Sequence, residues 1–114
     1  MHWKTIHTKA DLTQAIEKSH SGPILLFKHS TRCAISSMAF DRLDRYWDKD
    51  EMMQTEGLLI DVIRDRELSR YIEDHFGIRH ESPQVLLIRA GEVIFHDSHM
   101  GIAYDSLKQA LSDS

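Results

Sequence analysis

The only cysteine of the chain, Cys33, lies in the segment HSTRCAISS, after a short apolar run and just before an expected helix. A thiolate in the first turn of a helix accepts unpaired backbone N–H groups and sits at the positive end of the helix dipole. The cationic side chain of Arg32 is adjacent and favours the same ionised form. Free cysteines are often simply buried as small hydrophobic residues, but these surroundings favour a reactive thiol.

Four polar neighbours could assist such a thiol. Ser36 follows Cys33 by three residues, and its hydroxyl can hydrogen-bond a thiolate but cannot form a disulfide with it. The alternative for Ser36 is a capping or surface role in the first helical turn. Lys28 and Arg32 are either ordinary solvated cations or the groups that attract an anionic thiol substrate. His29 is a candidate base, or a side chain that only closes the end of a strand.

The hydrophobic pattern predicts the elements that must hold this segment. Strands are expected at residues 3–7, 24–27 and 58–63 and in a hairpin about Ala90-Gly91, and helices after Thr8, over residues 34–48, from Asp65 to Gly77 and around Leu107. The helix over residues 34–48 is expected to bury one apolar stripe, which consists of Ile35, Met38, Ala39, Leu43, Tyr46 and Trp47.

Strands that alternate with helices, followed by a hairpin and a last helix, predict an α/β fold with a central mixed sheet and helices on both faces. Such sheets place their sites beyond the carboxyl ends of the central strands. The strand that begins at Ile24 ends at Lys28, directly before the segment of Cys33. The thiol is therefore expected at the edge where such folds carry their chemistry.

This order of elements, a cysteine at the start of the second helix and the run FGIRHESPQVLLIRAGEVIF together resemble the thioredoxin superfamily. The likeness spans nearly the whole chain and implies one thioredoxin-like domain over residues 1–114. It also implies that Pro83 follows a cis peptide bond, which presents the backbone of Ser82 beside Cys33 for pairing with a substrate. Without the resemblance, Pro83 would be interpreted as an ordinary turn proline.

Within that superfamily, HSTRCAISS is most similar to the monothiol bacilliredoxins, whose motif has a threonine-rich loop, one cysteine and a following Ile-Ser. The resemblance implies a role for Thr31 at the site, bacillithiol as co-substrate with no bound cofactor, and bacillithiolated proteins as partners. The family usually has proline directly after the cysteine, where this chain has Ala34. Proline would pre-set the backbone of the first helical turn, so alanine could loosen the loop without removing a chemical group.

Composition narrows the partners and the compartment. The 114 residues carry a formal net charge of -4 with acids and bases interleaved, which argues against nucleic acid as the main partner. No secretion signal or membrane-spanning stretch is expected, and a lone thiol suits a reducing cytoplasm. His96 and His99 are the best candidates for a metal site, but zinc needs three or four convergent ligands, so no metal is expected.

Two functions remain from this reasoning. The first is a monothiol oxidoreductase that removes bacillithiol from protein mixed disulfides through Cys33 and relies on a second bacillithiol to resolve the adduct. The alternative is a non-catalytic thioredoxin-like stress or protein-interaction module whose cysteine is modified without turnover, which Ala34 and the lack of a resolving thiol favour. Peroxide reduction is the weaker third hypothesis, because no set of residues stands out that could polarise a peroxide.

Overall fold

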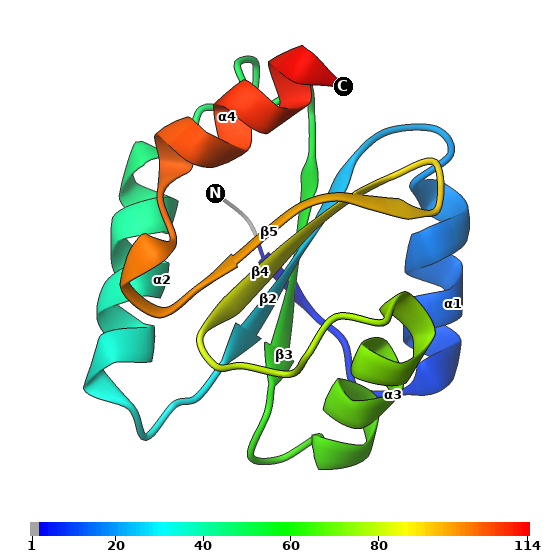
Figure 1. Ribbon diagram of the computed structural model, residues 1–114, viewed down its shortest axis with the longest axis vertical. Coiled ribbons are helices and arrows are strands. Elements are labelled where there is room, and N and C mark those ends of the chain that lie inside the picture. Colours follow the sequence, from blue (N-terminus) through cyan, green and yellow to red (C-terminus); the bar gives the residue numbers. More distant parts are fainter. Residues whose placement is uncertain (1–2) are drawn as a thin grey trace.

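The computed structural model describes residues 3–114, in which five strands form a single mixed sheet (Figure 1). The elements follow in the order β1 (Trp3–Thr5), α1 (Lys9–Lys18), β2 (Ile24–His29), α2 (Ala34–Tyr46), β3 (Glu56–Asp61), α3 (Arg66–Phe76), β4 (Gln84–Arg89), β5 (Glu92–Ser98), the short 3-10 helix η1 (His99–Gly101) and α4 (Tyr104–Asp113). The strand order across the sheet is β1-β3-β2-β4-β5. The expected α/β architecture is thereby confirmed.

The central strand β2 pairs in parallel with β3 and antiparallel with β4, so it is covered along both edges. Its residues Ile24 to Lys28 are buried, as a strand enclosed on both faces requires. Register places Lys28 opposite Gln84 on β4 and His29 opposite Asp61 on β3. The end of β2 therefore lies beside the end of β3 and the start of β4.

The sheet separates two hydrophobic clusters. Alternation along β2 sends Ile24 and Leu26 to the face covered by α1 and α3, and Leu25 and Phe27 to the face covered by α2 and α4. The first cluster includes the helix residues Leu12, Leu68 and Ile72, and the second includes Ala39, Leu43, Leu107 and Leu111. Each helix is therefore fixed to the sheet by an apolar stripe of its own.

The second helix differs from the sequence prediction. It covers residues 34–46 and buries Ser36, Ala39 and Leu43, whereas Ile35, Met38 and Tyr46 are exposed to solvent. Positions 36, 39 and 43 follow helical spacing, but the first of them is a serine, which does not contribute to an apolar pattern. The inward stripe is therefore rotated relative to the prediction, and part of the expected stripe faces solvent.

The third strand also differs from its predicted bounds, because it ends at Asp61 and leaves Val62 and Ile63 in a turn. The Asp61 carboxylate accepts hydrogen bonds from the backbone N–H groups of Ile63 and Arg64, at 3.0 and 3.1 Å. An aspartate that binds backbone two and three residues ahead favours a turn over a continued strand. Hydrophobicity alone therefore extended the predicted strand too far.

Candidate functional site

Cys33 occupies the N-cap position of α2, in the loop that follows β2. Its backbone N–H donates to the Ser30 carbonyl at 3.1 Å, and its own carbonyl accepts from the Ser37 N–H at 3.1 Å. The thiol is partly exposed and makes no capping hydrogen bond within residues 3–114. The backbone is thus anchored on both sides, while the sulfur stays accessible at the positive end of a 13-residue helix.

The side chain of Ser36 connects the first turn of α2 to the end of β2 and to the loop that precedes Cys33. Its buried hydroxyl accepts the Ser30 N–H at 3.0 Å and lies 2.6 Å from Nδ1 of His29. A hydroxyl has one proton and two lone pairs, so these two contacts use most of its capacity. The structure therefore places Ser36 as a support for the loop of Cys33, and no hydrogen bond joins it to the thiol among the described residues.

His29 is a positioned ring rather than a mobile surface side chain. It is half-buried, stacks on Phe40 with centroids 5.6 Å apart and meets the edge of Phe27 at 6.0 Å. Burial lowers the pKa of His29, and the carboxylates of Asp61 and Asp41 oppose that shift. Since Nδ1 faces Ser36, a proton transfer by this ring would have to use Nε2.

The Ser82–Pro83 peptide bond is cis, as the resemblance to thioredoxins implies. Because Gln84 pairs with Lys28, Pro83 lies at the end of β2 where the loop of Cys33 begins. The Pro83 carbonyl accepts the backbone N–H of His99 at 2.9 Å, which ties η1 to the same edge. The hydroxyl of Ser82 is buried there and has no partner within residues 3–114.

Lys28 does not fit the expected role of attracting a substrate from solvent. It is fully buried on the α3 face of the sheet, where its Nζ donates to the Ser69 carbonyl at 3.3 Å and lies 3.1 Å from Nδ1 of His80. Burial lowers the pKa of Lys28 to about 8, against the opposing effect of the Glu73 carboxylate. The sequence analysis missed this polar cluster, although the alternation of β2 places Lys28 on the same face as Leu26.

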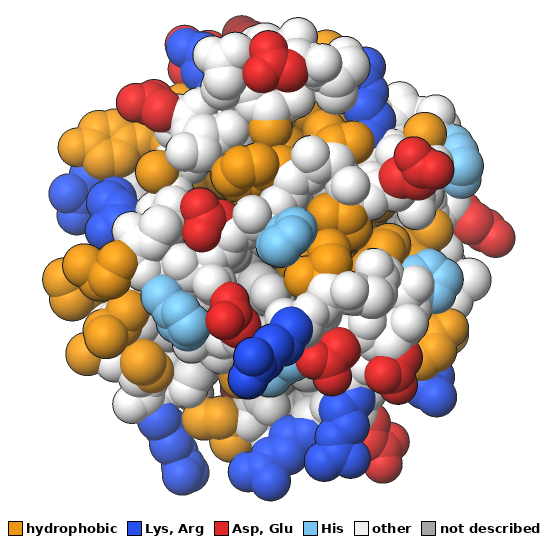
Figure 2. Space-filling model, in the orientation of Figure 1, with side chains coloured by type: hydrophobic (Ala, Val, Ile, Leu, Met, Phe, Trp, Pro, Cys, Tyr) orange, Lys and Arg blue, Asp and Glu red, His pale blue; other side chains and the backbone are white. Residues whose placement is uncertain are grey.

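Thr31 and Arg32 are exposed on the loop immediately before Cys33. The guanidinium of Arg32 is therefore the cation of this loop that a substrate approaching from solvent can reach. Figure 2 shows Lys and Arg side chains along the lower margin of one face, interspersed with Asp and Glu, at the end of the sheet where Figure 1 places the tips of β2 and β3. Cations are therefore present at this end of the sheet, although the whole chain is acidic.

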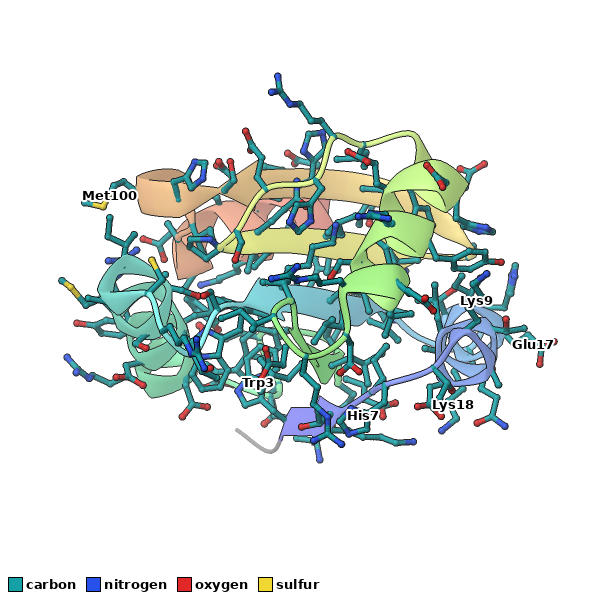
Figure 3. All side chains as sticks on the ribbon, turned by 90° about the horizontal axis from the view of Figure 1, so that it is seen from below. Trp3, His7, Lys9, Glu17, Lys18 and Met100 are labelled. Carbon is teal, nitrogen blue, oxygen red and sulfur yellow. The ribbon has the colours of Figure 1, made fainter. Side chains whose placement is uncertain are left out.

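An apolar surface lies beside the thiol. Ile35 and Met38 on α2 are 47% and 62% exposed, and Met100 on η1 is 75% exposed. The 3-10 helix η1 packs against α2, and Met100 projects away from the body of the protein (Figure 3). We call these three residues the apolar rim; it is continuous with the helix that begins directly after Cys33.

The histidine pair considered as a metal site has no support. Within residues 3–114, no three His, Cys, Asp or Glu side chains converge as metal ligands.

No helix within residues 3–114 is long and apolar enough to cross a bilayer.

Comparison with known proteins agrees with this geometry. A sequence model of the monothiol bacilliredoxin BrxC matches residues 4–107. The chain belongs to this family. Among solved structures, a candidate oxidoreductase with a thioredoxin fold is 29% identical, with 96% of this chain and 93% of that chain covered and a TM-score of 0.84.

More distant thioredoxins share the fold. Thioredoxin from Fasciola hepatica is 15% identical over 96% of this chain and 97% of its own, with a TM-score of 0.73. Thioredoxin from Trypanosoma brucei brucei is 11% identical over 98% and 89%, with a TM-score of 0.77. Family and fold together assign this bacilliredoxin-family chain a thiol redox role and identify it as a thioredoxin-like oxidoreductase.

Proposed function

We propose that the protein is a monothiol oxidoreductase that removes bacillithiol from mixed disulfides on other proteins. The observation that carries the proposal is a single cysteine, partly exposed at the start of α2, with a serine buried in the first turn of that helix three residues later. A chain with one cysteine cannot release a thiol adduct by forming an internal disulfide. Its cycle must therefore use an external thiol.

The reaction has two exchange steps. The Cys33 thiolate attacks the bacillithiol sulfur of the mixed disulfide, the disulfide bond breaks, and the client thiolate leaves and takes a proton from water. The thiolate of a second bacillithiol then attacks the bacillithiol sulfur held on Cys33. Cys33 leaves as the thiolate and bacillithiol disulfide is released, so the client sulfur is reduced to the thiol while the incoming free bacillithiol is oxidised to the disulfide.

The neighbours of Cys33 receive different roles in this proposal. Arg32 attracts the anionic low-molecular-weight thiol, with the exposed Thr31 beside it on the same loop. The backbone of Ser82 pairs with an extended substrate segment next to the cis peptide bond. Ser36 and His29 hold the loop. A reducing cytoplasm is the compartment in which such a thiol stays available.

The decisive experiment follows the adduct by intact-protein mass spectrometry. Wild-type protein mixed with a bacillithiolated client alone should accumulate one bacillithiol per chain, and added free bacillithiol should discharge it and permit turnover. Cys33→Ala should abolish both steps. Ser36→Cys should instead release the adduct through an internal disulfide, because residues three apart in a helical turn lie within disulfide reach.

The second candidate function is a module whose cysteine is modified without turnover. Ala34 favours it, because α2 begins here without the proline that would fix its first turn. If free bacillithiol fails to discharge the adduct, this module replaces the enzyme. If wild-type protein turns over repeatedly without external thiol, or if Cys33→Ala remains active, the monothiol mechanism is wrong.

A further inference from the structure

The sheet ends at β5, whose outer edge pairs with no other strand within residues 3–114. Figure 1 draws this strand in front of β4, so Figure 2, in the same orientation, looks onto the free edge and shows hydrophobic side chains around its middle. An edge strand of seven residues presents backbone N–H and C=O groups that another extended chain can pair with. The free edge of β5 is therefore a candidate interaction surface.

The backbone of His96 is directed at this free edge. At the end of the β4–β5 ladder, the His99 N–H donates to the Pro83 carbonyl at 2.9 Å. In an antiparallel ladder only every second residue bonds the partner strand. Because His96 lies an odd number of residues before His99 in a regular part of the register, its N–H and C=O point away from β4. One donor and one acceptor are thus available to an added strand at this position.

A groove of about 720 Å³ lies beside the same edge and is lined by residues of β5 and α4. Figure 1 shows that α4 runs alongside β5 in the opposite direction. The lining includes an apolar part, which consists of Ile94 and Phe95 on β5 and Ala110 on α4, and all three residues are only partly buried. Every second side chain of a strand added to β5 would point to this face and cover that apolar surface.

Two aspartates of α4 give the groove a negative charge. Asp105 and Asp113 line it, are exposed and form no ion pair within residues 3–114, and no Lys or Arg belongs to the lining. Gln109 donates a hydrogen bond to Asp113 at 3.0 Å, but its amide carries no charge. The groove therefore favours a cationic occupant.

The spacing of the two carboxylates suits an extended chain. Asp105 and Asp113 are eight residues apart, which corresponds to about 12 Å along the axis of α4. In a strand, residues four apart point to the same face and stand about 13 Å from each other. Two basic side chains at this spacing, with an apolar side chain midway, therefore match both the carboxylates and the apolar lining.

A second copy of the chain fits this edge poorly. Antiparallel pairing of β5 with β5 of a second copy would place both α4 helices on the same face of the joined sheet, so Asp105 and Asp113 of each copy would meet like charges. We propose that the free edge of β5 and the β5–α4 groove bind an extended segment of a partner protein with the pattern basic–x–apolar–x–basic. The segment adds to the sheet as a sixth strand, and its binding does not depend on the redox reaction of Cys33.

The test uses three blocked pentapeptides, which are titrated into the full chain at low salt and followed by amide chemical shifts in two-dimensional NMR. Acetyl-Lys-Thr-Val-Thr-Lys-amide has the proposed pattern, acetyl-Thr-Lys-Val-Lys-Thr-amide has the same composition in another order, and acetyl-Glu-Thr-Val-Thr-Glu-amide has the opposite charge. The first peptide should cause saturable shifts in residues 92–98 and 104–114. It should bind at least about threefold more tightly than the second and about fivefold more tightly than the third. Amide exchange of His96 should slow several-fold at saturation, because its N–H gains an acceptor.

Matched variants assign the binding to this groove. Asp105→Asn and Asp113→Asn should each weaken binding of the first peptide about two- to threefold, the size expected for an exposed charge pair. Asp74→Asn, which removes an exposed aspartate from α3, should leave it unchanged. His96→Pro should abolish binding, because proline is tolerated on a free edge but lacks the outward N–H.

Three results would overturn the proposal: absence of saturable shifts, equal affinity for the two lysine peptides, or equal weakening by Asp74→Asn and Asp113→Asn. Sedimentation velocity of the chain without peptide should show a monomer. A dimer that His96→Pro converts to a monomer would mean that a second copy occupies the edge, and the proposed partner segment would be wrong.

Discussion

Ser36 supports the loop of Cys33 without forming a hydrogen bond to the thiol among residues 3–114. Ser36 joins the start of α2 to the end of β2 through Ser30 and His29, and thereby fixes the loop from which the sulfur projects. In a protein that resolved its own adduct, a cysteine at this position would form an internal disulfide with Cys33. Here the hydroxyl of Ser36 occupies the position and hydrogen-bonds Ser30 and His29, which is consistent with the proposed reliance on an external thiol.

Ser36→Ala tests this division of roles. Loss of a buried hydroxyl that leaves the Ser30 N–H and the His29 ring without their partner should lower the free energy of unfolding by about 1–3 kcal/mol. Bacillithiol adduct formation at Cys33 should persist under conditions where the variant is folded. Urea unfolding and mass spectrometry measure the two effects, and Ser37→Ala, at the neighbouring half-buried serine, is the control with little expected change in stability.

Lys28 predicts an unusual dependence of stability on pH. Its pKa is about 8 in the folded protein and near the ordinary value of 10.5 when unfolded. Between these values the unfolded chain holds the proton and the folded protein has lost it, so stability rises with pH through this window. Relative to Lys28→Met, the free energy of unfolding of the wild type should increase by roughly 2 kcal/mol between about pH 7 and about pH 9.5.

The measurement is urea unfolding of both proteins at a series of pH values. Titrations that the two proteins share cancel in the difference, so the change isolates the amine. Below about pH 7 Lys28 holds its proton in both states and adds no further slope, and the two proteins then differ only in the titration of His80, whose pKa the charge of Lys28 lowers. A difference that stays constant across the whole range would show that the buried amine does not titrate in this window.

At the scale of elements, the sequence predicted which helices and strands exist better than it predicted which face each one presents. The order of strands and helices followed from apolar runs and turn residues, and Thr8 and Gly77 cap α1 and α3 as expected. The orientation of α2 did not follow, because a hydrogen-bonded serine takes a buried position. The burial of Lys28 was not predicted from the sequence either, because its hydrogen-bond partners come from α3 and from the segment before β4.

The same distinction applies to the site. A lone cysteine before an amphipathic helix marks the candidate reactive residue from sequence alone, because helix termini have a fixed polarity. The contacts of Ser36 with His29, seven residues earlier, and of Lys28 with His80 depend on how the chain folds back on itself. No local pattern in the sequence encodes those partners.

The rotated α2 leads to a prediction about client selection. The apolar rim is exposed beside the thiol, and apolar residues at the centre of an interface carry much of its binding energy. Met38→Glu should lower kcat/KM for a bacillithiolated protein about five- to tenfold, and should leave the rate with the bacillithiol–cysteamine mixed disulfide nearly unchanged. Steady-state kinetics with the two substrates separate these effects.

Met53→Glu is the matched control, since Met53 is also exposed but precedes β3, at the end of the sheet opposite Cys33. It should not alter either rate. Equal losses with both substrates in Met38→Glu would mean that the substitution disturbs the thiol itself and that the rim does not bind clients.

At the scale of the whole molecule, charge is unevenly distributed. The chain has a formal net charge of -4, yet the loop that bears Cys33 exposes the cation of Arg32 directly before the thiol. A reagent that diffuses to the thiol responds mainly to charges within about one Debye length, which is roughly 30 Å at 0.01 M salt and roughly 3 Å at 1 M. Within that length the nearest charges weigh most, because the Coulomb energy falls with distance, so Arg32 should outweigh the net charge in the encounter with an anion.

Alkylation of Cys33 by iodoacetate and by iodoacetamide tests this, because the two reagents carry the same leaving group but differ in charge. Each rate constant is divided by that of free cysteine with the same reagent. The normalised rate constant for iodoacetate is then divided by that for iodoacetamide, and this ratio reports the electrostatic potential at the thiol. That ratio should fall about two- to fivefold between low and high salt, and Arg32→Ala should reduce it at low salt by a similar factor. Arg45→Ala, which removes a similar charge from the exposed face of α2, should change it less. A ratio that rises with salt would mean that the net negative charge governs the approach, and Arg32 would then lose its proposed role in attracting the anionic thiol.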